Sequence, residues 1–295
     1  MQELAGKIAV ITGAGDGMGR AMALAFAARG MHVVAADIDE ARLAKVAQEI
    51  KALGVDVLVQ RTDVAERDQV KMLADAAYTR FGVVNLLVNN AGVVGSLATR
   101  LRDLDLRAWD WVLDINTKGV IYGIHYFLAR MLDSGAPGHI VNTASMAGLS
   151  SGLGGGAYTA SKHAVVAISR TLRAETEGTN LGVSVLCPSF VHTNLVHNTS
   201  ALVAGRNDMP ADRRAAGIDS GAMDRLQQMI ESGIAPELVA DMVVDSVEVN
   251  RFYIVTHPGS AAGLEENVWA QIRADHADLQ TRFAHRLPQA DAAGD

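Results

Sequence analysis

A tyrosine and a lysine near the middle of the chain have the types and spacing that proton transfer requires. Tyr158 and Lys162 stand four residues apart in A-Y-T-A-S-K-H, so on a helix they share one face. A nearby ammonium favours the ionised phenol and moves its pKa from ~10 toward neutrality, where a general base works. Ser145 ends a strand-like stretch upstream. A tyrosine–lysine pair also arises by chance, so its meaning depends on the elements around it.

The composition limits the classes of partner. The chain has 295 residues, 49% of them hydrophobic, and a formal net charge of −7. A negative surface disfavours nucleic acid and anionic membranes, so we expect a small-molecule substrate. The single cysteine, Cys187, allows no intrachain disulfide and suits a reducing compartment. The N-terminal M-Q-E-L-A-G-K has no signal-like apolar core, and no run reads as a membrane span. We predict a cytoplasmic protein without a metal site.

Strand-like and helical patterns alternate along most of the chain. Apolar, β-branched runs cover residues 7–12, 32–37, 55–61, 84–89, 138–144, 181–187 and 251–257. Helical patterns cover residues 18–29, 40–53, 66–81, 106–132, a stretch from about 157, and 235–247. This alternation predicts an α/β fold, a Rossmann-type doubly wound parallel sheet of about seven strands with helices on both faces. We expect a single domain over residues 1–286, a substrate lid at 194–235 and a disordered tail at 287–295.

The first predicted strand leads into a glycine-rich turn, T-G-A-G-D-G-M-G-R, at residues 12–20. The G-x-G-x-x-G spacing fails because Met18 stands at its third glycine, but T-G-x-x-x-G-x-G fits through Gly13, Gly17 and Gly19. Glycines let a pyrophosphate approach the backbone at a helix N-terminus, where the dipole favours an anion. The turn predicts a dinucleotide site, and a glycine-rich turn without a ligand is the alternative.

The second predicted strand ends at Asp37, about 20 residues past the glycine turn. A carboxylate there accepts both ribose hydroxyls of an adenosine and repels a 2′-phosphate. Asp16 and Asp39 add negative charge, and no Arg or Lys lies between Ile38 and Ala41. We therefore expect NAD rather than NADP. For Asp39, a helix cap is the simpler interpretation.

Together, the T-G-x-x-x-G-x-G turn, Asp63, N-N-A-G at 89–92, Asn116, Ser145 and Y-x-x-x-K strongly resemble the short-chain dehydrogenase/reductase family over roughly residues 5–193. The resemblance implies that Tyr158 is the general acid/base of an alcohol–ketone interconversion while hydride moves to or from nicotinamide. It also implies that Lys162 binds the nicotinamide ribose and that Ser145 polarises the substrate oxygen. The catalytic set is thus Asn116, Ser145, Tyr158 and Lys162.

Asn116 lies inside the predicted helix at 106–132, where asparagine is an indifferent helix former. The resemblance implies a local break that binds a water and relays protons from Lys162, and an exposed mid-helix asparagine is the alternative. The residues expected at the cofactor are Gly13, Asp16, Gly17, Met18, Gly19, Asp37, Ile38, Asp63, Val64, Asn90, Ala91, Gly92, Tyr158, Lys162, Pro188, Val191 and Thr193.

The segment C-P-S-F-V-H-T-N-L after the sixth predicted strand resembles the family's P-G-x-V-x-T. Val191 and Thr193 match that pattern and would contact the carboxamide. Ser189 replaces the usual glycine, and if that glycine has a positive φ, serine would strain the turn or change its path. For His192 we expect a solvent-facing side chain.

The expected substrate pocket is apolar, with Val94, Met146, Leu153 and Met223 among its residues. We therefore expect a bulky, largely apolar secondary alcohol or its ketone. A substrate with a carboxylate group is the alternative, because Arg100, Arg206 or Arg213 could bind it. The C-terminal part also resembles members that oxidise aryl-alkyl alcohols, such as lignin-dimer Cα-dehydrogenases. The family implies a homodimer or homotetramer. An NAD-binding sensor or scaffold without redox turnover is the alternative function.

Overall fold

The computed structural model describes residues 1–95, 99–151, 155–204, 227–257, 259 and 269–283. The chain divides into two compact units, Met1–Thr256 and His257–Asp295. The first unit carries the sheet, and the second contains α12 (Ala270–Phe283). The first unit ends before the boundary expected at residue 286, and the extent of the domain beyond Thr256 stays a prediction. The tail predicted at 287–295 lies outside the described residues, as do residues 205–226 of the predicted lid.

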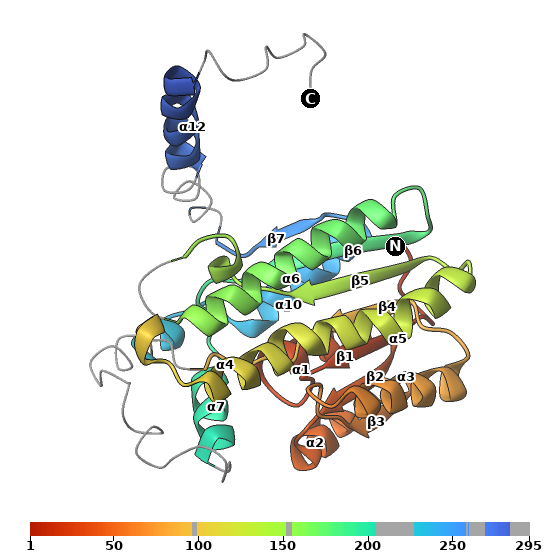
Figure 1. Cartoon of the computed structure of the whole chain (residues 1–295). Helices are drawn as coiled ribbons and strands as arrows, with labels where there is room; N and C mark the ends of the chain where they lie inside the picture. The colour runs from red at the N-terminus through yellow and green to blue at the C-terminus, as the bar shows by residue number, and fades with distance from the viewer. Residues whose placement is uncertain (96–98, 152–154, 205–226, 258, 260–268, 284–295) are drawn as a thin grey trace. The chain divides into compact units, whose positions relative to one another are not determined.

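Seven parallel strands form one sheet in the order β3-β2-β1-β4-β5-β6-β7 (Figure 1). The strands are β1 (Ile8–Thr12), β2 (His32–Asp37), β3 (Val57–Arg61), β4 (Leu86–Asn89), β5 (Gly138–Thr143), β6 (Leu181–Cys187) and β7 (Tyr253–Val255). The strand order reverses between β1 and β4, and ligands of such sheets bind beyond the carboxyl ends at this switch point. The predicted Rossmann-type fold is confirmed.

Helices cover both faces because successive strand residues point to opposite sides. Ala9 and Ile11 of β1 pack with α1 (Gly17–Ala28), α2 (Glu40–Ala52) and α10 (Pro236–Glu248). Ile8 and Val10 pack with α3 (Arg67–Phe81), α5 (Gly119–Asp133) and α6 (Gly156–Glu175) on the other face. Among the described residues, no helix is both long enough and apolar enough to cross a bilayer.

One predicted helix is interrupted. The pattern at 106–132 forms α4 (Leu106–Leu113), a π-helical turn η2 (Asp114–Lys118) and α5, so the long helix has a break at Asn116. Short elements that the sequence patterns did not separate are η1 (Leu101–Asp103), η3 (Met146–Gly148) and α7 (Leu195–Ala204). Both η3 and α7 follow a strand at the carboxyl edge of the sheet, where the site lies.

Candidate active site

Two adjoining cavities lie at the carboxyl ends of the strands. One of about 410 Å³ is lined by the glycine-rich turn, the end of β2 and residues of α7. The other, of about 370 Å³, contains Ser145, Tyr158 and Lys162. Both cavities include Met18, Asn90, Gly92, Val93, Thr193 and Leu195 in their walls. We call them the dinucleotide cavity and the substrate cavity.

The glycine-rich turn packs too tightly for side chains at its glycines. A Cβ on Gly19 would lie 1.9 Å from the carbonyl oxygen of Gly13, so a side chain there would force the backbone to move. Gly13 and Gly17 have φ of 65° and 51°, a region that favours glycine. Asp16 is the N-cap of α1, and its Oδ1 accepts from the Gly17 amide at 2.8 Å. The turn therefore brings bare backbone and a helix N-terminus to the cavity wall.

The carboxylate of Asp37 is held in place at the end of β2. Its Oδ2 accepts from the Gly15 amide at 2.9 Å, and its Oδ1 accepts from the Asp39 amide at 3.0 Å. Ile38, Asp63 and other predicted residues line the same cavity. Asp39 caps α2 through the Arg42 amide at 3.0 Å, as its simpler interpretation predicted. Each Asp37 oxygen keeps a second lone pair free for a hydroxyl donor.

The N-N-A-G segment connects β1, β4 and β5 rather than forming only a turn. The Thr12 hydroxyl accepts from the amides of Asn90 and Ala91 at 2.9 and 3.1 Å, and Asn90 Nδ2 donates to the Thr12 carbonyl at 3.0 Å. Asn89 Nδ2 donates to Asn142 Oδ1 at 2.9 Å inside the core. Asn90, Ala91 and Gly92 line the dinucleotide cavity, while Asn89 links β4 to β5.

Asn116 is buried and fully bonded, so the exposed mid-helix alternative is wrong. It is 1% exposed, and its Oδ1 accepts from the Val93 amide at 2.8 Å. Its Nδ2 donates to the Val93 carbonyl at 2.9 Å and to Ser161 Oγ at 3.0 Å. Ser161 Oγ in turn donates to the Tyr158 carbonyl at 2.7 Å. The π-helical turn is thereby tied to the first turn of α6.

Tyr158 and Lys162 lie on one face of α6, as their spacing predicted. Lys162 Nζ lies 5.7 Å from the centre of the Tyr158 ring and donates to the Thr143 carbonyl at 3.0 Å. Lys162 is 4% exposed, and burial lowers its pKa to about 8, although the nearby Cys187 thiol opposes the shift. Lowering the pKa of an ammonium makes its proton easier to exchange near neutral pH.

The pKa of Tyr158 shifts in the direction opposite to the one expected from its spacing to Lys162. Burial raises it above the ordinary value, and hydrogen bonding to Ser145 only partly opposes this. Desolvation of the phenolate outweighs the ammonium because Lys162 Nζ is directed to Thr143 rather than to the phenol oxygen. Ser145 Oγ accepts from the Ala147 amide at 3.1 Å, which fixes it at the start of η3.

The segment after β6 follows an unstrained path. Asn250 is the non-glycine residue with positive φ in the described parts of the chain, so Ser189 does not have the conformation that would have strained it. The Ser189 amide donates to Thr256 Oγ1 at 3.2 Å. Pro188, Val191 and Thr193 line the substrate cavity, and His192 is exposed as expected.

The structure places two of the four expected substrate residues. Val94 and Met146 line the substrate cavity, whereas Leu153 and Met223 lie outside the described residues. Leu195 and Ile230, both within the segment predicted as a lid, also line it, as does Phe190, which was not predicted. Lys162 is the one charged residue among its described lining. No cluster of three His, Cys, Asp or Glu side chains suited to a metal occurs within the described ranges.

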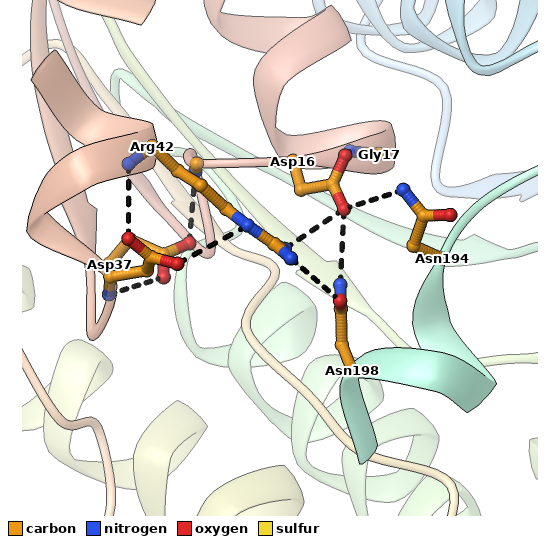
Figure 2. A network of polar contacts seen from close by, with 8 residues as sticks. Asp16, Gly17, Asp37, Arg42, Asn194 and Asn198 are labelled. Carbon is orange, nitrogen blue, oxygen red and sulfur yellow. Dashed lines mark hydrogen bonds and ion pairs between the residues drawn. The ribbon is translucent and has the colours of Figure 1, made fainter. Parts of the chain in front are cut away.

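Arg42, Asn194 and Asn198 were also missed by the sequence interpretation, although they line the dinucleotide cavity. Figure 2 shows them around Asp16. Arg42 lies just beyond the stretch between Ile38 and Ala41 that was examined for cations. A wider window would have found it, but nothing local marks the two asparagines.

Known proteins resemble the chain over most of its length. The chain is 36% identical over 267 residues to a 1-deoxy-11-beta-hydroxypentalenate dehydrogenase of Streptomyces avermitilis, covering 90% of each. It is 36% identical over 192 residues to a 3beta-hydroxysteroid dehydrogenase 2 of Eggerthella lenta, covering 65% of this chain and 74% of the relative. A crystal structure of a short-chain dehydrogenase/reductase from Burkholderia phymatum in complex with NAD has 39% identity, a TM-score of 0.83 and full coverage of both chains.

The narrower resemblance to lignin-dimer dehydrogenases stays a prediction. The resemblance to the whole family does not depend on that narrower match, because the family model described as short chain dehydrogenase matches residues 7–203. That range contains the glycine-rich turn, Asp37, the N-N-A-G segment and the Ser145, Tyr158 and Lys162 set. The chain therefore belongs to the short-chain dehydrogenase family of oxidoreductases.

Proposed function

We propose that the protein interconverts a bulky, largely apolar secondary alcohol and its ketone, using NAD and Tyr158 as the general acid/base. The observation that carries this proposal is the position of Tyr158, which lies in an apolar cavity that adjoins the dinucleotide cavity. Ser145 and Lys162 stand beside it in the same wall. An alcohol in this cavity would have its oxygen at the phenol and its carbon skeleton among apolar side chains.

The residues of the dinucleotide cavity fit a nicotinamide dinucleotide. A Cβ on Gly19 would fill the turn, and the N-terminus of α1 suits a pyrophosphate. When bound, the dinucleotide supplies the hydride acceptor or donor. Asp37, fixed by two amides, would accept ribose hydroxyls and repel a 2′-phosphate, which supports NAD over NADP.

The raised pKa of Tyr158 has a consequence for the direction of proton transfer. At neutral pH the phenol keeps its proton and can donate it to a carbonyl oxygen. In alcohol oxidation the phenol must lose that proton first, and the ammonium of Lys162 then favours the phenolate. Ser145 holds the substrate oxygen next to the phenol. We also propose, as the family resemblance implies, that Asn116 belongs to a proton relay between Lys162 and solvent. Its position supports this, because Asn116 Oδ1 and Lys162 Nζ both lie close to Gly92 and π-helical turns are frequent at functional sites.

The lining of the substrate cavity supports an apolar substrate. Its apolar members include Val93, Val94, Met146, Phe190 and Ile230. Lys162 is the one charged side chain in its described lining, and its ammonium already donates to the Thr143 carbonyl. A volume of about 370 Å³ lies in the range of pockets that take drug-sized molecules. The names of two relatives, which refer to a hydroxysteroid and a hydroxypentalenate, agree with this class.

The direct test follows nicotinamide absorbance with a panel of apolar secondary alcohols and their ketones. Tyr158→Phe should reduce kcat about 100- to 10,000-fold while NAD binds with nearly the wild-type Kd, because the phenol oxygen acts on the substrate. Tyr253→Phe, at a partly exposed position on β7, is the matched control. A Tyr158→Phe enzyme with full activity would refute the mechanism. A higher kcat/KM with NADP than with NAD would refute the role of Asp37.

We also propose that the protein forms a homodimer or homotetramer through the helices predicted at 106–132 and from about 157, which correspond to α4, α5 and α6. Leu106 on α4 is 76% exposed and Ile121 on α5 is 43% exposed, which leaves both apolar side chains available to a second subunit. Charged substitutions at both positions should shift the elution volume in gel filtration toward the monomer. Elution of the wild-type protein as a monomer would remove this proposal.

A further inference from the structure

The dinucleotide cavity is more acidic than a pyrophosphate ligand favours. Its described lining includes four carboxylates, Asp16, Asp37, Asp39 and Asp63, but one cationic side chain, Arg42. A pyrophosphate is itself an anion, so unpaired carboxylates near it oppose binding. Asp16 is the critical one, because it caps the helix N-terminus that a phosphate would approach. Something must compensate its charge.

Arg42 provides that compensation within a closed set of contacts, which we call the Asp16–Arg42–Asn198 triangle (Figure 2). Arg42 Nη1 lies 3.0 Å from Asp16 Oδ2, and Arg42 Nη2 donates to Asn198 Oδ1 at 3.0 Å. Asn198 Nδ2 donates back to Asp16 Oδ2 at 3.1 Å, and Asn194 Nδ2 donates to the same oxygen at 3.1 Å. Arg42 Nε also lies 3.3 Å from Asp39 Oδ2.

The charge on Asp16 persists at any pH at which such an enzyme works. Burial favours the neutral acid, but hydrogen bonds from Asn198, Asn194 and the Gly17 amide, together with the charge of Arg42, outweigh it and lower the pKa. Asp16 is therefore a fixed negative charge at the cavity wall. Its neutralisation depends on Arg42 rather than on protonation.

The triangle joins three separate elements. Asp16 belongs to the glycine-rich turn, Arg42 to α2 and Asn198 to α7. Leu195, Ala201 and Leu202 of α7 line the dinucleotide cavity as well, so this helix forms part of its wall. On the substrate side, Thr199 Oγ1 of α7 accepts from the Val94 amide at 3.3 Å. The contact between Arg42 and Asn198 therefore fixes a helix that contributes to the walls of both cavities.

We infer that Arg42 is a positioning residue for the dinucleotide, neutralising Asp16 beside the pyrophosphate and holding α7 against the cavity through Asn198. The inference rests on the proposed function, since it requires that NAD binds here. It assigns Arg42 no contact with the reacting atoms. This role of Arg42 differs from a purely structural one, because the partly exposed ion pair of Arg42 with Asp16 adds little to folding stability.

The test measures NAD binding and NADH release directly, by titration and by stopped-flow fluorescence. Arg42→Ala should weaken NAD binding at least tenfold and speed NADH release, with KM for NAD rising more than kcat falls. Adding Asp16→Asn to Arg42→Ala should restore most of the affinity, because the uncompensated charge at the N-terminus of α1 is removed. Asn198→Ala should speed NADH release with a smaller change in Kd. Higher salt should reduce the Arg42→Ala defect.

Arg20→Ala is the matched control. Arg20 on α1 pairs with Glu49 on α2 at 2.6 Å and is as exposed as Arg42, 38% against 37%, but it does not line the cavity. It should keep the wild-type Kd. If Arg42→Ala does not fold, Arg42→Gln carries the same expectation, with thermal unfolding as the check.

The outcomes separate the inference from the proposed function. A wild-type protein that does not bind NAD refutes the proposed function itself. Wild-type binding combined with equal Kd values for Arg42→Ala and Arg20→Ala overturns the inference. An Arg42→Ala defect that Asp16→Asn does not rescue overturns the neutralisation of Asp16.

Discussion

Acidification should destabilise the fold through one buried histidine at the opposite end of the sheet from the site. His139 on β5 is 0% exposed. Its Nε2 lies 2.7 Å from Ser184 Oγ, and that hydroxyl donates to the Arg251 carbonyl at 2.5 Å. Ser184 must therefore accept from Nε2–H, which leaves Nδ1 without a proton. Nδ1 is buried and has no hydrogen-bond partner in the described structure.

The magnitude follows from the pKa. Burial, with smaller contributions from the positive charges of the amino terminus and Arg173, lowers the pKa of His139 from 6.5 to about 3. The unfolded chain binds this proton below about pH 6.5, whereas the folded chain resists it down to about pH 3. The contribution of the neutral His139 to the free energy of unfolding is therefore present above about pH 6.5 and is lost as the pH falls below that value. At about 1.36 kcal/mol for each pH unit, the loss between pH 7 and pH 5 is about 2 kcal/mol.

Urea unfolding of the wild type and His139→Gln at pH 7 and pH 5 measures this loss. Glutamine does not titrate, and its amide can keep the donor to Ser184. Carboxylates titrate alike in both proteins, so their effect cancels in the comparison. The wild type should lose about 2 kcal/mol more than His139→Gln between the two pH values. Equal losses would refute the assignment of a neutral, partner-free Nδ1.

Three further changes test the packing around the site. Gly19→Ala should weaken NAD binding more than tenfold and lower Tm, because its Cβ would meet the Gly13 carbonyl oxygen; unchanged titration and melting curves would contradict this. Phe26→Ala removes a fully buried ring of α1 and should cost about 3–5 kcal/mol in urea unfolding; a loss below about 1 kcal/mol would mean that the core closes around the cavity. Ser189→Gly should destabilise by about 0.5–1 kcal/mol, because φ at this position does not require glycine, and a gain in stability would show the reverse.

The sheet and the positions of its carboxyl-end residues could be predicted because they depend on local patterns. Apolar runs between helical patterns define the strands, and the carboxyl ends of parallel strands necessarily share one edge. The location of Ser145, Tyr158 and Lys162 could be predicted because they follow a strand that ends at that edge. Their protonation could not be predicted, because the pKa of Tyr158 depends on how deeply it is buried and on where Lys162 Nζ is directed.

Other features depend on contacts that no local pattern reveals. The hydrophobic period continues through Trp111, Val112 and Val120 on either side of the π-helical turn, so periodicity does not reveal the break that the family resemblance implied at Asn116. Its cause is the hydrogen bonding of Asn116 to the Val93 backbone, 23 residues away. Arg42 and Asn198 are 156 residues apart, and only the fold brings them together.

The two ends of the segment between β6 and α10 meet at one point. Val191 and Ile234 form a parallel bridge, in which the His192 amide donates to the Ile234 carbonyl at 2.9 Å and the Ile234 amide donates to the Phe190 carbonyl at 3.2 Å. The chain thus returns at Ile234 to the place that it passed at Val191. Insertions or exchanges inside such a closed excursion cost little loop entropy and do not displace the strands. Exchanging apolar residues between these two fixed ends should therefore change the lining of the substrate cavity while β6 and α10 keep their positions.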